Sequence, residues 1–158
     1  MNAAIQRLRA EIQSDRAAWL GRVEELSELD LTRGDAGAFA RAAVALHHGY
    51  GAIESALERI ARTVEGSLPA GRDWHMALLE SMALAIEGVR PQVLSPESLK
   101  PLRRLLAFRH FFRHAYTANL EADKLDSLRL EMLGLRLALE RDLDQWDRHL
   151  AAVAADPG

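Results

Sequence analysis

An apolar seam at helical spacing is the feature that most constrains the fold of this sequence. Its members recur alternately about four and three residues apart: Phe39, Ala43, Leu46, Tyr50, Ile53, Leu57, Ile60 and Val64. Apolar residues at this spacing share one face of an α-helix and pack along a neighbouring helix. Asp35 is available as the N-cap of this helix, and Gly66 and Pro69 are expected to end it. Such a helix requires partner helices.

Four other segments also have helical patterns, and they predict an all-α, antiparallel bundle of about five helices. The expected helices cover residues 5–26, a short segment from Trp74 to about Ile86, residues 96–116, and a last helix carrying apolar residues from 125 to 146. Ser95 before Pro96, and Asn119, are the expected caps of the last two. Val, Ile and Thr do not alternate in runs, so no strand is expected.

Length and composition narrow the class of protein. The chain has 158 residues, which predicts a single domain over residues 1–158, with residues 152–158 as a frayed tail. A formal net charge of −3 does not favour a general nucleic-acid coat, so a nucleic-acid contact would be local. Cysteine is absent, which excludes disulfides and thiolate chemistry. The sequence has neither an apolar signal segment nor a membrane-spanning run, and a cytoplasmic location is expected.

Two packing expectations concern individual residues. The last predicted helix has a second apolar stripe at Leu130, Leu133 and Leu137, which favours either central burial or a subunit contact. Glycines on both sides of Tyr50 reduce helix stability, so close approach of another helix is expected there, with Tyr50 in the core. We also expect the Trp-His pair at residues 74–75 to pack against the bundle.

The segment FRHFFRHAY, residues 108–116, contains the candidate functional residues. Asp and Glu are absent between Lys100 and Tyr116, whereas basic residues and histidines are frequent. At about 100° per residue, Arg109 falls on the same stripe as the neighbouring leucines. A guanidinium on an apolar stripe requires a partner, because burying an unpaired charge is costly. The first or last helix could supply a carboxylate, and Glu54 of the seam helix is a further candidate.

Three interpretations of this segment remain open on spacing alone. It is an amphipathic helix whose charges are paired elsewhere, a metal site, or a phosphate-binding strip. The metal interpretation rests on His110 and His114, four residues apart, but no intervening glutamate or third ligand accompanies them. The phosphate interpretation uses the arginine forks for phosphate oxygens and histidine for proton transfer.

The segment from Arg109 through His114 to Tyr116 matches the R-x4-6-H-x-Y motif of HEPN domains. The chain resembles, in particular, the HepT-like ribonuclease toxins of toxin–antitoxin pairs. A second stretch, residues 46–82, is similar to the pattern of that subfamily, with its Tyr-x-x-Ile-Glu segment and Pro-x-Gly-x-x-Trp-His. Together the two stretches extend the resemblance over roughly residues 40 to 130.

The resemblance implies a HEPN-like bundle that forms a homodimer through its motif helices. It further implies the toxin of a type II/VII-like toxin–antitoxin pair, a metal-independent endoribonuclease that needs no cofactor, with Arg109 and His114 as catalytic residues. The implied partner is a minimal nucleotidyltransferase antitoxin that silences the toxin by transferring AMP to Tyr116. His110 and Arg113 are expected to support binding of the RNA phosphate.

A two-fold interface also answers a chemical requirement of such cleavage. Attack by the RNA 2′-hydroxyl needs a base, an acid and cations, whereas one motif supplies a single well-placed histidine. A dimer axis beside the motif would place two arginines and two histidines around one cleft. In that arrangement the arginines are expected to be unpaired in the free protein and to bind phosphate rather than a carboxylate. On one ideal helix, however, Arg109 and His114 point about 140° apart, so the helix must distort or end near Arg113. The alternative function is a non-catalytic HEPN-like module that binds a nucleotide or a nucleotidyltransferase.

Overall fold

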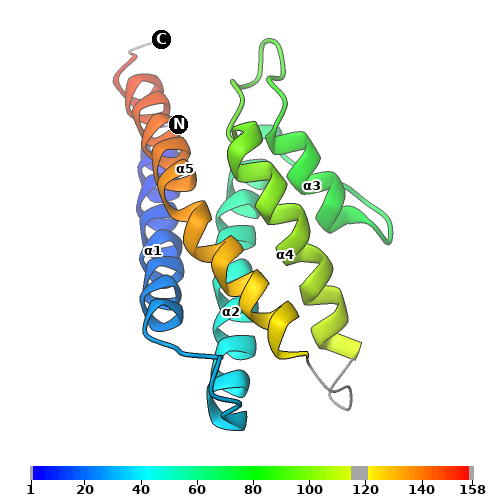
Figure 1. The fold of residues 1–158 in the computed structure, drawn as a ribbon. Coiled ribbons are helices and arrows are strands. Elements are labelled where there is room, and N and C mark those ends of the chain that lie inside the picture. Colours follow the sequence, from blue (N-terminus) through cyan, green and yellow to red (C-terminus); the bar gives the residue numbers. More distant parts are fainter. Residues whose placement is uncertain (1, 115–120, 157–158) are drawn as a thin grey trace.

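The computed structural model describes residues 2–114 and 121–156, with side chains for residues 2–110 and 121–156. The described residues form an all-α bundle (Figure 1). Its elements, in chain order, are α1 (Asn2–Ser27), α2 (Ala36–Ile60), the π-helix η1 (Ala61–Glu65), α3 (Trp74–Met82), α4 (Pro96–His114) and α5 (Ala122–Ala155). An isolated bridge between Ile86 and Arg90 is the single β-type pairing within the described part.

Helix α2, which carries the predicted seam, is the central element of the bundle. It packs against α1, α3, α4 and α5, and the long α5 also crosses α1 and α4 (Figure 1). Most seam residues are buried, including Tyr50 at 1% exposure, as predicted. Trp19 of α1 is also fully buried, and its Nε1 donates to the sulfur of Met132 of α5 at 3.2 Å. Apolar burial around α2 therefore fixes the positions of the other helices.

The predicted helix ends around the seam are confirmed. Asp35 is the N-cap of α2, and its Oδ1 accepts a hydrogen bond from Gly37 N at 2.9 Å. The helical segment ends at Gly66, whose φ of 82° is left-handed, a conformation in which glycine carries no steric penalty. Immediately before Gly66 the chain makes a π turn, so that Gly66 N donates to Ala61 O at 3.0 Å.

The start of α4 is also as predicted, with Pro96 in its first turn and Ser95 before it. The backbone carbonyl of Ser95 accepts from Leu99 N at 3.0 Å. Asp142 of α5, which is buried, accepts hydrogen bonds from both the backbone N and the hydroxyl of Ser95 at 2.9 Å. This contact fixes the start of α4 against α5.

One of the two glycines beside Tyr50 permits a close helix approach. A Cβ on Gly49 would lie 3.1 Å from the Met132 side chain and 3.4 Å from Arg22 Cβ, so α5 and α1 both crowd this position. A Cβ on Gly51 would meet nothing within 4 Å, and the expectation for that glycine was wrong.

Three further expectations are corrected. Helix α3 ends at Met82, and Ile86 lies in the turn that follows it. The helix ends early because the side chain of Arg90 donates hydrogen bonds to the backbone carbonyls of Ser81 and Leu84. Helix α5 begins at Ala122 with Glu121 at the N-cap position, and Asn119 lies outside the described residues. Of the two alternatives for the second stripe on α5, central burial is wrong, since Leu130 and Leu137 are 55% and 82% exposed, and a subunit contact stays a prediction.

The last helix continues to Ala155, so residues 152–155 are helical. No helix in the described part of the chain is long and apolar enough to cross a membrane.

Candidate functional site

Arg109 extends from α4 into the bundle. Its neighbours on the same stripe of α4, Leu102, Leu105 and Leu106, are all buried in the core. The guanidinium is consequently directed toward α2, and the Arg109 side chain is only 18% exposed. It forms an ion pair through Nη1 with Oε1 of Glu54, whose side chain is 4% exposed. The predicted need for a buried partner is confirmed, and Glu54, rather than a residue of the first or last helix, supplies it.

Glu54 joins three helices through one carboxylate. Oε1 accepts from Arg109 of α4, and Oε2 lies 2.8 Å from Nδ1 of His75, the second residue of α3. The hydroxyl of Tyr50, one turn earlier on α2, lies close enough to Glu54 for the negative charge of the carboxylate to raise the pKa of Tyr50. A buried carboxylate is costly unless its charge is paired and its lone pairs are used, and these donors meet that requirement.

Aromatic rings enclose the cluster. The Arg109 guanidinium carbon lies 5.7 Å from the centre of the Tyr50 ring, within the range of a cation–π contact. The ring of His75 stacks on Trp74 at 3.7 Å between centroids, and meets the ring of His110 edge-on at 5.7 Å. We use the term arginine cluster for Tyr50, Glu54, His75 and Arg109.

The environment of the arginine cluster favours a neutral Tyr50. Burial raises the pKa of the Tyr50 hydroxyl well above its usual range, and the negative charge of Glu54 adds to this effect. Tyr50 is therefore a hydrogen-bond donor at any physiological pH. Nε of Arg109 is enclosed and has no hydrogen-bond partner among the described residues. The guanidinium thus retains donor capacity after pairing with Glu54.

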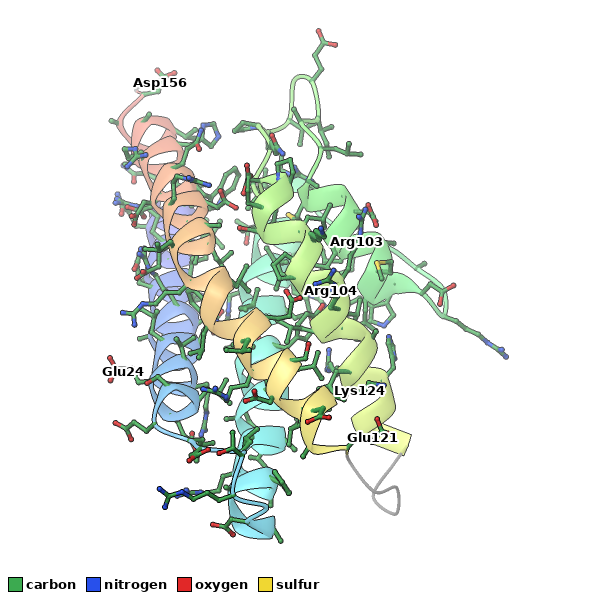
Figure 2. The ribbon with its side chains drawn as sticks, in the orientation of Figure 1. Glu24, Arg103, Arg104, Glu121, Lys124 and Asp156 are labelled. Carbon is green, nitrogen blue, oxygen red and sulfur yellow. The ribbon has the colours of Figure 1, made fainter. Side chains whose placement is uncertain are left out.

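Two other arginines of α4 are paired as well, each with a different helix. Arg103 binds Glu80 of α3 through two parallel hydrogen bonds of 2.8 and 2.7 Å, and these lower the pKa of the Glu80 carboxyl. Arg104 pairs with Glu131 of α5; Figure 2 shows both arginines on α4. The expectation of unpaired arginines is wrong for these residues and for Arg109, because neighbouring helices supply carboxylates that the α4 sequence lacks.

The other predicted site residues are only partly within the described region. His110 is exposed on α4 and contacts the arginine cluster through His75. His114 is the last residue of α4, but the side chains of Arg113 and His114 lie outside the described set. Tyr116 also lies outside it. The angular relation of Arg109 to His114 therefore stays a prediction.

His75 is the residue whose place in the site was missed. Its burial, and the packing of Trp74 against the core, agree with the expected packing role. Sequence reasoning did not connect it with Arg109. The available signal was that Glu54 and His75 belong to the same subfamily pattern, in its Tyr-x-x-Ile-Glu and Trp-His segments. Within the part of the chain that is described, no group of three or more His, Asp or Glu residues is placed to hold a metal ion.

The fold and the arginine cluster define an all-α protein with a buried carboxylate joining an arginine to a histidine. Comparison with protein families gives a match to the family described as HepT-like protein over residues 41–150, and the chain belongs to this family. Membership indicates a HEPN-type toxin of toxin–antitoxin systems, generally ribonucleases. The matched region includes most of α2, all of α3 and α4, and most of α5, and therefore the whole arginine cluster. Neither the curated proteins nor the solved structures gave a match.

Proposed function

We propose that the protein is the toxin of a type II/VII-like toxin–antitoxin pair and a metal-independent endoribonuclease. The observation that carries this proposal is the position of the Arg109 guanidinium. Arg109 lies in the motif helix α4, and its guanidinium is ion-paired with Glu54 and in cation–π contact with the ring of Tyr50, both on α2. A guanidinium in one fixed orientation is suited to the negative charge that builds up around phosphorus during cleavage. Membership of a family of HEPN-type toxins supports the same function.

The proposed reaction uses the 2′-hydroxyl of the RNA itself. Its oxygen, after losing a proton, attacks the adjacent phosphorus, and the bond from phosphorus to the 5′-oxygen breaks as that oxygen gains a proton. The products are a 2′,3′-cyclic phosphate and a 5′-hydroxyl. Arg109 stabilises the phosphorane and His114 transfers a proton, while His110 and Arg113 bind phosphate. In a homodimer with facing motif helices, two such sets would line one cleft.

One observation favours the alternative, a non-catalytic module that binds a nucleotide or a nucleotidyltransferase. Arg103, Arg104 and Arg109 are each already neutralised by a carboxylate. Arginines in this state attract RNA more weakly than free ones, because the field of a paired charge falls off quickly. A binding module, however, has no need of a buried histidine beside the arginine.

RNA cleavage by the purified protein in EDTA tests the proposal. We expect a structured RNA to be cut into fragments that carry 2′,3′-cyclic phosphate and 5′-hydroxyl ends, and expression of the protein alone to arrest growth. A matched RNA with 2′-deoxyribose at the cleaved position should resist, because the attacking oxygen is missing. Absence of cleavage, or equal cleavage of the deoxy control, would reject the ribonuclease in favour of the binding module.

Tyr116 is proposed to be the residue that the antitoxin modifies. We expect Tyr116→Phe to keep RNA cleavage but to escape silencing by a nucleotidyltransferase antitoxin and ATP. AMP on Tyr116 would add bulk and negative charge where the RNA phosphate binds, and so repel it. Intact-mass measurement reports the AMP groups, and a cleavage assay reports the silencing.

The chain offers a matched control for this measurement, since it contains only two tyrosines. Tyr50 is 1% exposed and unavailable to another enzyme, so Tyr50→Phe should still acquire AMP. AMP found on Tyr116→Phe would contradict the assignment.

A further inference from the structure

We propose that His75 is the general base of the same site, oriented for that role by Glu54. The inference rests on the proposed ribonuclease function and deepens it. It concerns a residue of α3 that lies outside the R-x4-6-H-x-Y motif. Nδ1 of His75 lies 2.8 Å from the buried carboxylate of Glu54 and 3.4 Å from Arg109, the arginine proposed to stabilise the phosphorane.

The two contacts of Nδ1 indicate which ring nitrogen carries the proton. Oε2 of Glu54 lies 2.8 Å from Nδ1, whereas Nη1 of Arg109 lies 3.4 Å from it. Glu54 is ion-paired with Arg109 through Oε1, and a carboxylate in an ion pair accepts hydrogen bonds, so the shorter contact places a proton on Nδ1. A neutral His75 then has its lone pair on Nε2. The hydrogen bonds of the His75 ring within residues 2–110 and 121–156 all involve Nδ1, so none of those residues occupies the Nε2 lone pair.

The surroundings hold the ring in this state. Its face is covered by Trp74, and α4 contributes Arg109 and His110 while α2 contributes Glu54 and Tyr50. A carboxylate on Nδ1 sets the tautomer and stabilises the imidazolium that forms when Nε2 takes a proton, the arrangement of general-base histidines in catalytic triads. The His75 side chain remains 10% exposed, which leaves an edge of the ring open to solvent.

The step assigned to His75 completes the proton balance of the reaction. Nε2 takes the proton of the RNA 2′-hydroxyl, the freed oxygen forms its bond to phosphorus, and the bond to the 5′-oxygen breaks. The proton needed by that leaving oxygen comes from a different group, for which His114 is the proposed donor. Each protomer would then carry both a base and an acid, whereas the motif alone provides one histidine.

Steady-state cleavage by His75→Gln tests the base assignment. We expect kcat to fall by about 10²- to 10⁴-fold, the usual contribution of a general base, with KM changed only a few-fold. A substrate with a p-nitrophenolate leaving group in place of the 5′-nucleoside should show the same loss, because it needs no acid but still needs the base. His48→Gln is the matched control, since His48 is exposed on α2, and it should cleave like the wild type.

Nitrogen-15 NMR of the wild-type protein provides a second test that does not depend on a variant folding. We expect the neutral His75 ring to carry its proton on Nδ1. Three results would each overturn the base assignment. One is a proton on Nε2, and the second is a folded His75→Gln that cleaves RNA within twofold of the wild type. The third is recovery of activity by that variant on the p-nitrophenyl substrate. In these cases the ribonuclease function stands, because the wild type still cleaves RNA. Loss of cleavage in the wild type would instead overturn the function itself.

Discussion

Arg109→Ala is expected to reduce RNA cleavage by about 10³-fold, in line with the removal of a fixed cation from a developing phosphorane. We expect this loss because contacts with the Glu54 carboxylate and the Tyr50 ring fix the orientation of the Arg109 guanidinium. Cleavage rates measured with RNA in excess separate this effect from weaker binding. Circular dichroism must accompany the assay to show that the variant is folded, because Arg109→Ala removes the ion-pair partner of the buried Glu54 carboxylate.

Arg103→Ala is the matched control for this prediction. It removes the same side chain from the same helix, but Arg103 is exposed and bound only to Glu80. We expect cleavage within about threefold of the wild type, because exposed ion pairs contribute little. His114→Ala should be as inactive as Arg109→Ala. Equal loss in Arg103→Ala and Arg109→Ala would indicate a general electrostatic role and contradict the assignment of Arg109.

Arg90→Met is expected to lower the free energy of unfolding by about 3–5 kcal/mol, the range for breaking a buried ion pair on one side. The Arg90 side chain has no exposed surface and pairs with Glu65 of η1 at 2.6 Å. Its two Nη groups also donate to the backbone carbonyls of Leu84 and Ser81, at 2.8 and 3.0 Å. Methionine fills a similar volume but leaves these acceptors without donors. Urea unfolding followed by circular dichroism measures the change.

Arg62→Met controls for the loss of one charge near η1. The Arg62 side chain is 64% exposed and lies 3.9 Å from Glu58, so the change should cost less than about 1 kcal/mol. A similar loss in both variants would mean that net charge, rather than the buried hydrogen bonds of Arg90, determines the stability.

Local signals were sufficient to predict much of the fold. The seam of α2, the cap at Asp35 and the stop at Gly66 depend on spacing and on single residues, and all three are confirmed. The same reasoning placed Arg109 on an apolar stripe, and that placement required a buried partner. Glu54 was among the candidates because it lies on the seam helix.

Other features could not be read from local sequence because they depend on contacts between distant residues. Helix α3 ends early where Arg90, which follows it in the chain, takes up the carbonyls of Ser81 and Leu84. His75 joins the arginine cluster only because the loop after Gly66 returns α3 to the side of α2 and α4. Leu130 has the spacing of a core residue, yet no helix of the described chain covers it. Periodicity identifies an apolar face but not whether another element packs on it.

The shared carboxylate of Glu54 determines how free energies in this cluster combine. One side chain serves Arg109 through Oε1 and His75 through Oε2, so each of the three residues changes the environment of the other two. Losses caused by single substitutions then do not add, and a double-mutant cycle would show coupling between α3 and α4 even though their shared partner lies on α2. The free energy that a substitution at any of these positions reports belongs to the three residues as a unit.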